Sequence, residues 1–209
     1  MDLLHPDINR YLDALLPERH AKLIEMERFA KERDFPIIGP QVGRVLYQYV
    51  KLTGARRVFE MGSGFGYSAF WIALALPEGG KVICTEASQN NVDLAEDYLK
   101  VAGLRPKVEL KIGDALKILP KTEGLFDLIF CDVDNEFYPA ALELAQSRLR
   151  AGGVLITDNA LFQGRVLNAK PDATTRGVIE YNRNAFNSEA LWTTILPVRD
   201  GLAVSWKIN

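Results

Sequence analysis

The chain has 209 residues, of which 48% are apolar and 25% are charged, the composition of an ordinary globular protein. A chain of this length can bury a full core, and a single domain over residues 1–209 is the expectation. Its net charge of −2 at pH 7 provides no basic excess for binding a polyanion, so no nucleic-acid partner is expected.

No apolar run reaches the roughly 18 to 20 residues that span a bilayer, which predicts no membrane partner. The N-terminal segment carries Asp2, Asp7 and Asp13 and lacks the basic and then apolar layout of a signal peptide. Both cysteines, Cys84 and Cys131, lie inside short apolar runs, where buried and reduced thiols are expected. A cytoplasmic location is therefore the expectation.

Histidine is scarce in this chain. Its 2 histidines, His5 and His20, both lie near the N-terminus. Because histidine is the usual base at neutral pH, a histidine-based triad or a histidine-rich metal site is not expected. Acid–base or metal chemistry in the main body of the chain must use carboxylates, amides, lysines or tyrosines.

The N-terminal part, residues 1–54, is predicted to be helical. Apolar residues at helical spacing predict a helix with one buried face, formed by Ile8, Tyr11, Leu12, Leu15 and Leu16. Pro17 ends that helix, and a second is expected over residues 18–33. A third covers residues 40–52 and stops at Gly54. Its buried side is expected to be Val42, Val45, Leu46 and Tyr49.

From residue 55 to residue 209, short apolar strands alternate with helices. This alternation predicts an α/β fold with a parallel sheet and right-handed crossovers. Residues 126–131 are apolar at nearly every position, as expected for a strand buried on both faces. Strands are expected over residues 57–61, 81–86, 107–112, 126–131 and 153–157, and helices over residues 67–76, 89–102, 137–149 and 174–186.

The last part of the chain breaks the alternation. Residues 192–198 and 202–208 are two predicted strands, joined by Arg199, Asp200 and Gly201. Because Asp-Gly is a strong signal for a tight turn, these strands are expected to form an antiparallel hairpin. A parallel core with a terminal hairpin differs from the symmetric, two-halved dinucleotide fold.

A glycine-rich turn follows the first predicted strand, with the sequence Gly62-Ser63-Gly64-Phe65-Gly66-Tyr67-Ser68. Glycines allow the backbone to turn tightly and to approach a ligand closely. Gly62 and Gly64 fit the first two positions of the nicotinamide dinucleotide motif, but the third glycine position falls on Tyr67. A nicotinamide oxidoreductase is therefore disfavoured, while a purely structural turn remains an alternative.

Acidic residues follow the second and third predicted strands. Glu86 lies where an acid can accept both hydroxyls of a ribose, or can stabilise the N-terminus of the next helix. Asp114, followed by Ala115, lies where a side chain can meet an adenine amino group or cap a short helix. With the glycine turn, these residues indicate a nucleoside-containing cofactor. No lysine of the Walker type is present, which argues against nucleotide hydrolysis.

Hard oxygen ligands follow the fourth and fifth predicted strands. Asp132 ends one strand, and Asp158 and Asn159 end the other. Ligands of such sheets bind at the carboxyl ends of the strands, near the point where the strand order reverses. Two carboxylates and an amide suit Mg²⁺, Mn²⁺ or Ca²⁺. The alternative is that Asp158 and Asn159 only form a turn.

Together these motifs resemble one family, the cation-dependent O-methyltransferases related to catechol and caffeoyl-CoA O-methyltransferases. The motifs that carry the resemblance are Gly39-Pro40-Gln41, residues 57–62, Gly66-Tyr67-Ser68, residues 126–132, Gly152-Gly153-Val154 and Asp158-Asn159. The resemblance spans nearly the whole chain. It implies a class I methyltransferase fold, a Rossmann-like and mostly parallel sheet of order 3-2-1-4-5-7-6, and a homodimer.

The resemblance also implies an activity, S-adenosylmethionine-dependent O-methyl transfer to a small catechol-like acceptor with two vicinal hydroxyls. It assigns Asp132, Asp158 and Asn159 to a divalent cation. The residues expected to bind the cofactor are Gly62, Ser63, Gly64, Tyr67, Ser68, Glu86, Asp114, Ala115 and Asp132.

One position departs from the family. The family pattern after the fourth strand is typically Asp-x-Asp-Lys, and the lysine is the proposed base. In this chain the lysine position is Asn135, and an asparagine cannot accept a proton at neutral pH. Asp132 and Asn135 are the expected catalytic residues. A cation that lowers the pKa of the acceptor hydroxyl would make a dedicated base less critical. Phe162 and Tyr138 are expected to pack in the core or to border the acceptor. The alternative function is cofactor binding with weak or lost methyl transfer.

Overall fold

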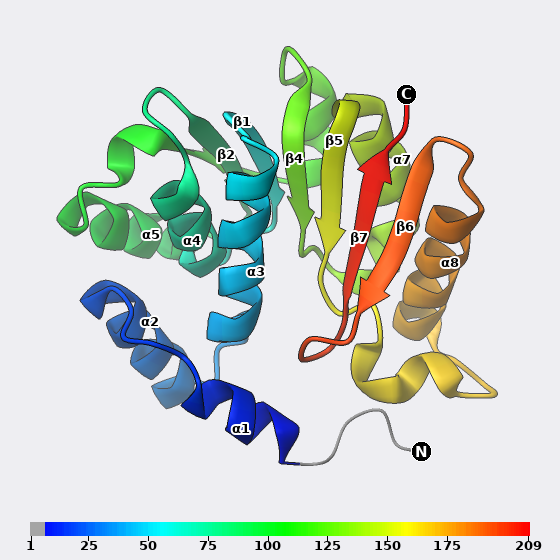
Figure 1. The fold of residues 1–209 in the computed structure, drawn as a ribbon, viewed down its shortest axis with the longest axis horizontal. Coiled ribbons are helices and arrows are strands. Elements are labelled where there is room, and N and C mark those ends of the chain that lie inside the picture. The colour runs from blue at the N-terminus through cyan, green and yellow to red at the C-terminus, as the bar shows by residue number, and fades with distance from the viewer. Residues whose placement is uncertain (1–6) are drawn as a thin grey trace.

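The computed structural model describes residues 7–209, so Asp2 and His5 lie outside the described part of the chain. Its strands form one seven-stranded sheet of order β3-β2-β1-β4-β5-β7-β6, which confirms the predicted order (Figure 1). The strands are β1 (Arg57–Met61), β2 (Lys81–Glu86), β3 (Val108–Ile112), β4 (Phe126–Cys131), β5 (Leu149–Thr157), β6 (Leu191–Leu196) and β7 (Leu202–Lys207).

Strands β1 to β5 are parallel, and β7 runs antiparallel to both β5 and β6. The turn of the β6–β7 hairpin is closed by the amide of Gly201, which donates to the carbonyl of Val198 at 2.9 Å. Strand β5 begins at Leu149 rather than at residue 153 as expected. Gly152 therefore lies inside the strand with Gly153, next to a register shift in its pairing with β4.

Helices cover both faces of the sheet, and the strand residues alternate between the two layers. One layer consists of α2 (Ala21–Glu32), α3 (Gly39–Leu52), α4 (Tyr67–Ala75) and α5 (Gln89–Val101). The other layer consists of α6 (Ala115–Ile118), α7 (Tyr138–Arg148) and α8 (Ala173–Asn187). In β4, Leu128 belongs to the first core and Ile129 to the second, and both are fully buried. The prediction of strands buried on both faces is therefore confirmed.

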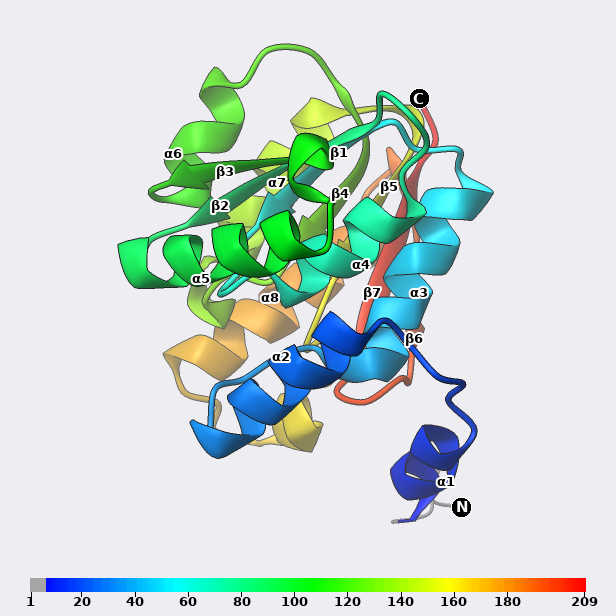
Figure 2. The same ribbon diagram turned by 90° about the vertical axis from the view of Figure 1, so that its left-hand side faces the viewer.

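The prediction of a buried face on the first helix was wrong. Helix α1 (Ile8–Ala14) has no buried residue, and Tyr11 is 59% exposed. Helices α2 to α5 already fill the nearby face of the sheet, and Figure 2 shows α1 away from it. Leu12 and Leu16 instead border a groove of about 760 Å³ that they share with α3. The apolar spacing predicted the helix correctly, but it did not predict which part of the protein the apolar side chains would contact.

The second helix begins at Ala21, three residues later than expected, because the side chain of His20 caps it. The ring nitrogen Nδ1 of His20 accepts from the amide of Lys22 at 3.1 Å. The last helix, α8, runs one residue beyond its predicted range at each end. Within residues 7–209, no helix combines the length and the apolar character that a membrane crossing requires.

Candidate active site

Four neighbouring strands end in register at the carboxyl edge of the sheet. Met61 of β1 pairs with Thr85 of β2 and with Cys131 of β4, which in turn pairs with Thr157 of β5. The next residue on each strand is therefore in one row, which reads Glu86, Gly62, Asp132 and Asp158. Two backbone bonds extend the ladder into this row, from the amide of Asp132 to Met61 at 2.9 Å and from that of Asp158 to Cys131 at 3.1 Å.

The glycine turn passes close to this row because its first residue has no side chain. Gly62 adopts a φ of 82°, and a Cβ there would lie 2.5 Å from the carbonyl oxygen of Asp132. Any other residue would be both strained and too close. Gly66, with a φ of 87°, begins helix α4, and a Cβ at this position would meet Ala95 at 2.8 Å. These two glycines are required by the turn.

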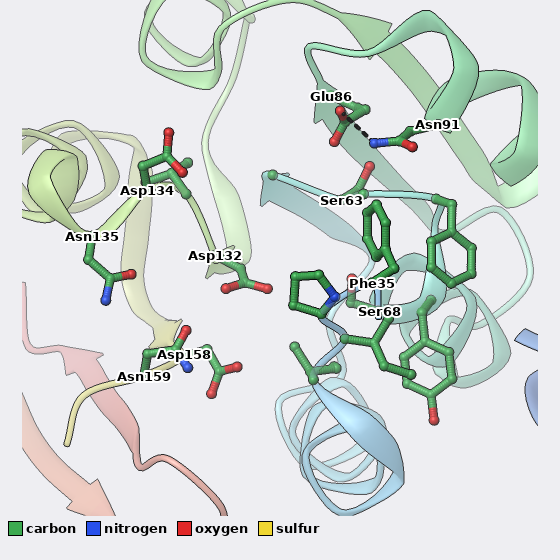
Figure 3. A pocket seen from close by; sticks show the side chains of 18 of the residues that line it. Phe35, Ser63, Ser68, Glu86, Asn91, Asp132, Asp134, Asn135, Asp158 and Asn159 are labelled. Atoms are coloured by element: carbon green, nitrogen blue, oxygen red, sulfur yellow. Dashed lines mark hydrogen bonds between the residues drawn. The ribbon is translucent and has the colours of Figure 1, made fainter. Parts of the chain in front are cut away.

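The sheet edge and the glycine turn border a pocket of about 680 Å³ (Figure 3). Most of the predicted site residues line it, namely Gly62, Ser63, Gly64, Tyr67, Ser68, Glu86, Asp132, Asn135, Asp158 and Asn159. Phe162 also lines it. Tyr138 does not; it is fully buried, and its hydroxyl donates to the carbonyl of Asp158 at 3.1 Å. Of the two aromatic candidates, one borders the pocket and the other supports a residue that does.

The side of the pocket opposite the sheet comes from the N-terminal part. Residues 35–38, between α2 and α3, line the pocket, although nothing in the sequence singled them out. Phe35 packs edge-on against Phe65 with ring centroids 5.1 Å apart, and it lies over Gly64. The N-terminal part therefore completes the site. The segment that does so is an apolar stretch between two helices, and a sequence pattern cannot predict where it lies in the fold.

Glu86 lies at one end of the pocket, and its side chain is held in position. Its Oε1 atom accepts from the side-chain nitrogen of Asn91 at 3.1 Å and from the amide of Ser88 at 2.9 Å (Figure 3). Both bonds go to the same oxygen. The carboxylate therefore supports the start of α5, which was the structural alternative, while also lining the pocket.

Asp114 and Ala115 line a second cavity of about 370 Å³, which shares Gly62, Glu86 and Asp132 with the first. The carboxylate of Asp114 accepts from the amide of Leu116 at 2.9 Å and so caps α6. The helix-cap prediction for Asp114 is confirmed, and its side chain borders the cavity as well. The two cavities together extend along the ends of β1 to β5.

Tyr67 belongs to the pocket wall, but its hydroxyl is engaged elsewhere. It donates to Oε1 of Glu27 at 2.7 Å, and Nε of Arg19 donates to the same oxygen at 2.7 Å. This network ties the first turn of α4 to α2. The hydroxyl proton of Tyr67 is therefore not available to a ligand in the pocket.

Asp132 and Asp158 share the pocket with little to offset their charges. Burial raises the pKa of the Asp158 carboxyl to about 6. The pKa of Asp132 is raised well above its usual value, mainly by burial and to a smaller extent by the negative charges of Asp158 and Glu60. Oδ1 of Asp158 is buried without a hydrogen-bond partner. The guanidinium of Arg199, in the β6–β7 turn, lowers both pKa values but does not cancel the effect of burial.

A divalent cation fits this arrangement. Figure 3 shows Asp158 and Asn159 side by side, with Asp132 nearby on the same pocket. A buried carboxylate oxygen without a partner, beside a second carboxylate and an amide, is the oxygen-rich environment that Mg²⁺, Mn²⁺ and Ca²⁺ favour. Within residues 7–209, no group of three or more His, Cys, Asp or Glu side chains could hold a metal ion. The candidate set therefore depends on the amide of Asn159 as its third ligand.

Glu60, two residues before Gly62 of the row, was missed by the sequence analysis. It is fully buried beneath the first turn of α4, and neither carboxylate oxygen has a hydrogen-bond partner within bonding distance. Burial raises the pKa of this carboxyl to about 7, although the nearby Ser68 hydroxyl and Cys84 thiol act in the opposite direction. The available signal was that Glu60 is a charged residue inside a short apolar strand whose last four residues are all buried.

Comparison with known proteins identifies the family. Residues 17–208 match the model of a family described as O-methyltransferase. The chain belongs to the O-methyltransferase family. It is 29% identical over 210 residues to a catechol O-methyltransferase from Niastella koreensis, with 95% of each chain covered. It is 29% identical over 212 residues to a caffeoyl-CoA O-methyltransferase from Medicago sativa, covering 94% of this chain and 85% of the relative.

A solved structure agrees with this assignment. The O-methyltransferase of tomaymycin synthesis from Streptomyces achromogenes, in complex with S-adenosylmethionine, superposes with a TM-score of 0.88 at 27% identity. The match covers 97% of this chain and 96% of that one. The present chain is therefore an S-adenosylmethionine-dependent methyltransferase with the class I fold, and the predicted family and fold are confirmed.

The buried acid of this O-methyltransferase makes stability depend on pH. Because the pKa of Glu60 is raised from 4.5 to about 7 in the folded protein, the folded state binds a proton more tightly than the unfolded state between these values. Its contribution to the free energy of unfolding is full below pH 4.5 and falls by about 3 kcal/mol as the pH rises through 7. Urea unfolding of the ligand-free protein at pH 5 and pH 8 should show this loss.

Glu60→Gln is the matched variant, because glutamine keeps the shape and cannot ionise. Its free energy of unfolding should fall less steeply between the two pH values, since only the other acids of the site still titrate. Parallel losses in the two proteins would show that Glu60 does not carry a raised pKa.

Proposed function

We propose that this enzyme transfers the methyl group of S-adenosylmethionine to a hydroxyl of a small catechol-like acceptor, with Mg²⁺, Mn²⁺ or Ca²⁺ held by Asp132, Asp158 and Asn159. The observation that carries the proposal is the pair of carboxylates with raised pKa values, one with an unpartnered buried oxygen, in the pocket that the glycine turn borders. The catechol O-methyltransferase among the relatives supports the acceptor class.

The cofactor is assigned to the glycine side of the two cavities. Glu86 lies between them and lines both, so its free carboxylate oxygen is suited to accept from ribose hydroxyls. Asp114 and Ala115 border the smaller cavity, which would take the adenine. Ser63 and Ser68 line the larger cavity near the start of α4. Gly62 and Gly64 let the backbone approach the ligand.

The acceptor is assigned to the side of Asp158 and Asn159. S-adenosylmethionine supplies a methyl group on a positively charged sulfur, and a divalent cation lowers the pKa of an adjacent acceptor hydroxyl. The residues of the chain contribute position: Asp132 lines both cavities and would help to hold the acceptor oxygen close to the methyl group. Correct alignment accounts for much of the rate in such displacements. Phe35 and Phe162 border the pocket and help to exclude water.

Among residues 7–209, no lysine lines the pocket, and Asn135 occupies the family position for the base. Asn135 begins the short helix η3 (Asn135–Phe137), where its amide is suited to orient a hydroxyl or a water molecule. The acceptor proton leaves to solvent past the exposed carboxylates of Asp134 and Glu136. This path favours acceptors whose hydroxyl is already acidic, such as catechols with electron-withdrawing groups.

We also propose a homodimer, joined through the open part of the sheet. Trp192 of β6 and Trp206 of β7 pair directly across the hairpin and are 72% and 48% exposed. In the described part of the chain, no helix covers the face of β7 and β6 that is turned toward the viewer in Figure 1. A second copy of the chain would cover these two indoles.

We further propose that residues 1–209 act as one domain in the reducing environment of the cytoplasm. Residues 35–38 of the N-terminal part complete the pocket of the α/β core, which supports one unit. Cys84 and Cys131 are both free and buried, as predicted.

Methyl transfer to 3,4-dihydroxybenzaldehyde tests the central proposal, with turnover measured over a range of Mg²⁺ concentrations. Asp158→Asn removes one charge from the cation ligands and should raise the Mg²⁺ concentration for half-maximal rate by about 10- to 100-fold. Asp172→Asn, at the cap of α8, removes an exposed carboxylate and should leave this concentration unchanged. Turnover that persists after chelation of all divalent cations would contradict the cation assignment.

Asn135→Lys tests the role of the missing base. On unsubstituted catechol at pH 7, a lysine at this position should raise the turnover number about tenfold, because it accepts the proton that Asn135 cannot. Asn135→Gln adds length without a base and serves as the control. If the lysine variant is no faster than the glutamine variant, proton removal does not limit the rate.

Sedimentation velocity at micromolar concentration tests the dimer surface. Trp192→Arg should shift the protein from dimer to monomer, because it places a charge in the apolar contact. Phe186→Arg, which replaces a 55% exposed aromatic residue of α8, should leave the dimer intact. A wild-type protein that sediments as a monomer would refute the proposal.

A further inference from the structure

The segment that follows β5 adopts an unusual backbone conformation beside the pocket. Asn159, Phe162 and Gln163 have φ values of 54°, 44° and 51°, and Gly164 has a φ of 76°. Left-handed backbone is costly for residues other than glycine and persists only where the surroundings support it. The segment carries two pocket residues, Asn159 and Phe162, so its support bears directly on the site.

The support comes from the β6–β7 turn, about 40 residues later in the chain. The carboxylate of Asp200 accepts from the amide of Gln163 with Oδ1 and from the side-chain nitrogen of Asn159 with Oδ2, the latter at 3.1 Å. The backbone carbonyls of Asp200 and Gly201 accept from the amides of Leu161 and Ala160, each at 2.9 Å. Four hydrogen bonds thus join one turn to one short segment.

Close contact between the two segments also requires glycine in the turn. A Cβ on Gly201, whose φ is 85°, would lie 2.5 Å from Cγ of Leu161. The Asp-Gly pair therefore has two functions here: the glycine permits the approach, and the aspartate binds the segment. The turn that closes the hairpin also forms part of the support of the pocket.

The chemistry of the Asp200 contact fixes the orientation of Asn159. An ionised carboxylate only accepts hydrogen bonds, so the NH₂ group of Asn159 must face Asp200. The carbonyl oxygen Oδ1 of the same amide then points away from Asp200. Asn159 lies beside Asp158, whose Oδ1 is buried without a partner, and Figure 3 shows both on the pocket.

We propose that Asp200 is a positioning residue that holds the amide oxygen of Asn159 toward the cation site and thereby sets the affinity of that site. The proposal rests on the proposed cation-dependent function. Asp200 does not line the main pocket, and its proposed effect on the cation site is exerted through Asn159. Groups that orient metal ligands commonly change metal affinity by about 10- to 100-fold when they are replaced.

Reversing the polarity of the hydrogen bond provides the test. In Asp200→Asn, the new amide offers one oxygen, which the amide of Gln163 takes, and presents its NH₂ group to Asn159. The side chain of Asn159 then turns its own oxygen toward residue 200 and its NH₂ group toward the cation site. In the double variant Asn159→Asp with Asp200→Asn, one oxygen of Asp at position 159 accepts from the new NH₂ group and the other oxygen again faces the cation site, with the net charge unchanged.

The probe is Mn²⁺ alone, with free Mn²⁺ counted by electron paramagnetic resonance in the absence of acceptor and turnover. Asp200→Asn should weaken Mn²⁺ binding by at least about tenfold, and the double variant should bind within about threefold of the wild type. Asp127→Asn is the control for general destabilisation. Asp127 accepts from the amides of Arg56 and Arg57 and pairs with Arg150 at the opposite end of the sheet. This variant should bind Mn²⁺ like the wild type.

Two results would overturn the proposal while leaving the proposed function intact: equal Mn²⁺ affinity in Asp200→Asn and wild type, or a double variant as weak as the single one. If Asp200→Asn does not fold, the double variant still decides, because it keeps the hydrogen bond between residues 159 and 200. A wild-type protein that does not bind Mn²⁺ at all would overturn both the cation assignment and this proposal.

Discussion

The in-register ends of four parallel strands determine the geometry of this site. Because Thr85, Met61, Cys131 and Thr157 pair across β2, β1, β4 and β5, each strand contributes its next residue to one row at the edge of the sheet. Neighbouring strands lie about 4.8 Å apart, so the row spans about 14 Å. A shift of one residue in any pairing would turn a side chain of this row to the other face. The arrangement of these side chains is thus a consequence of strand register.

This row and the neighbouring Glu60 concentrate acidic side chains at a poorly solvated edge. Glu60 and Asp158 are buried, and the pKa values of Glu60, Asp132 and Asp158 are all raised. Burial without a compensating charge destabilises the ionised form of each acid. In this structure Arg199 offsets only part of that charge. A divalent cation would supply the rest, and this electrostatic demand is the physical basis of our proposal for Asp132, Asp158 and Asn159.

Much of the fold could be predicted because its signals are local. Apolar runs mark strands such as β4, glycines mark the turn after β1, and the residue that follows each strand lies at the same edge of the sheet. The motif residues around Gly62, Asp132 and Asp158 were therefore found from the sequence. Two alternatives were predicted for Asp114, a helix cap and a contact with adenine; the structure confirms the cap and shows the side chain on a cavity.

The remaining features depend on contacts between distant segments. The exposure of α1 follows from other helices that already cover the sheet, which its own apolar stripe does not reveal. Phe35 reaches the pocket only because α2 and α3 pack beside α4, and Glu60 is a single acid inside an apolar strand. Asp200 was interpreted as a turn residue alone, because its bonds to Asn159 and Gln163 form only in the folded chain.

Calorimetric titration of 3,4-dihydroxybenzaldehyde into the protein saturated with S-adenosylmethionine, with and without Mg²⁺, tests the central claim most directly. We expect heat of binding only when Mg²⁺ is present, because two vicinal oxygens of the acceptor would bind to a cation held by Asp132, Asp158 and Asn159. Equal binding with and without Mg²⁺ would contradict the account. It would show that the carboxylates of Asp132 and Asp158 do not act through a cation.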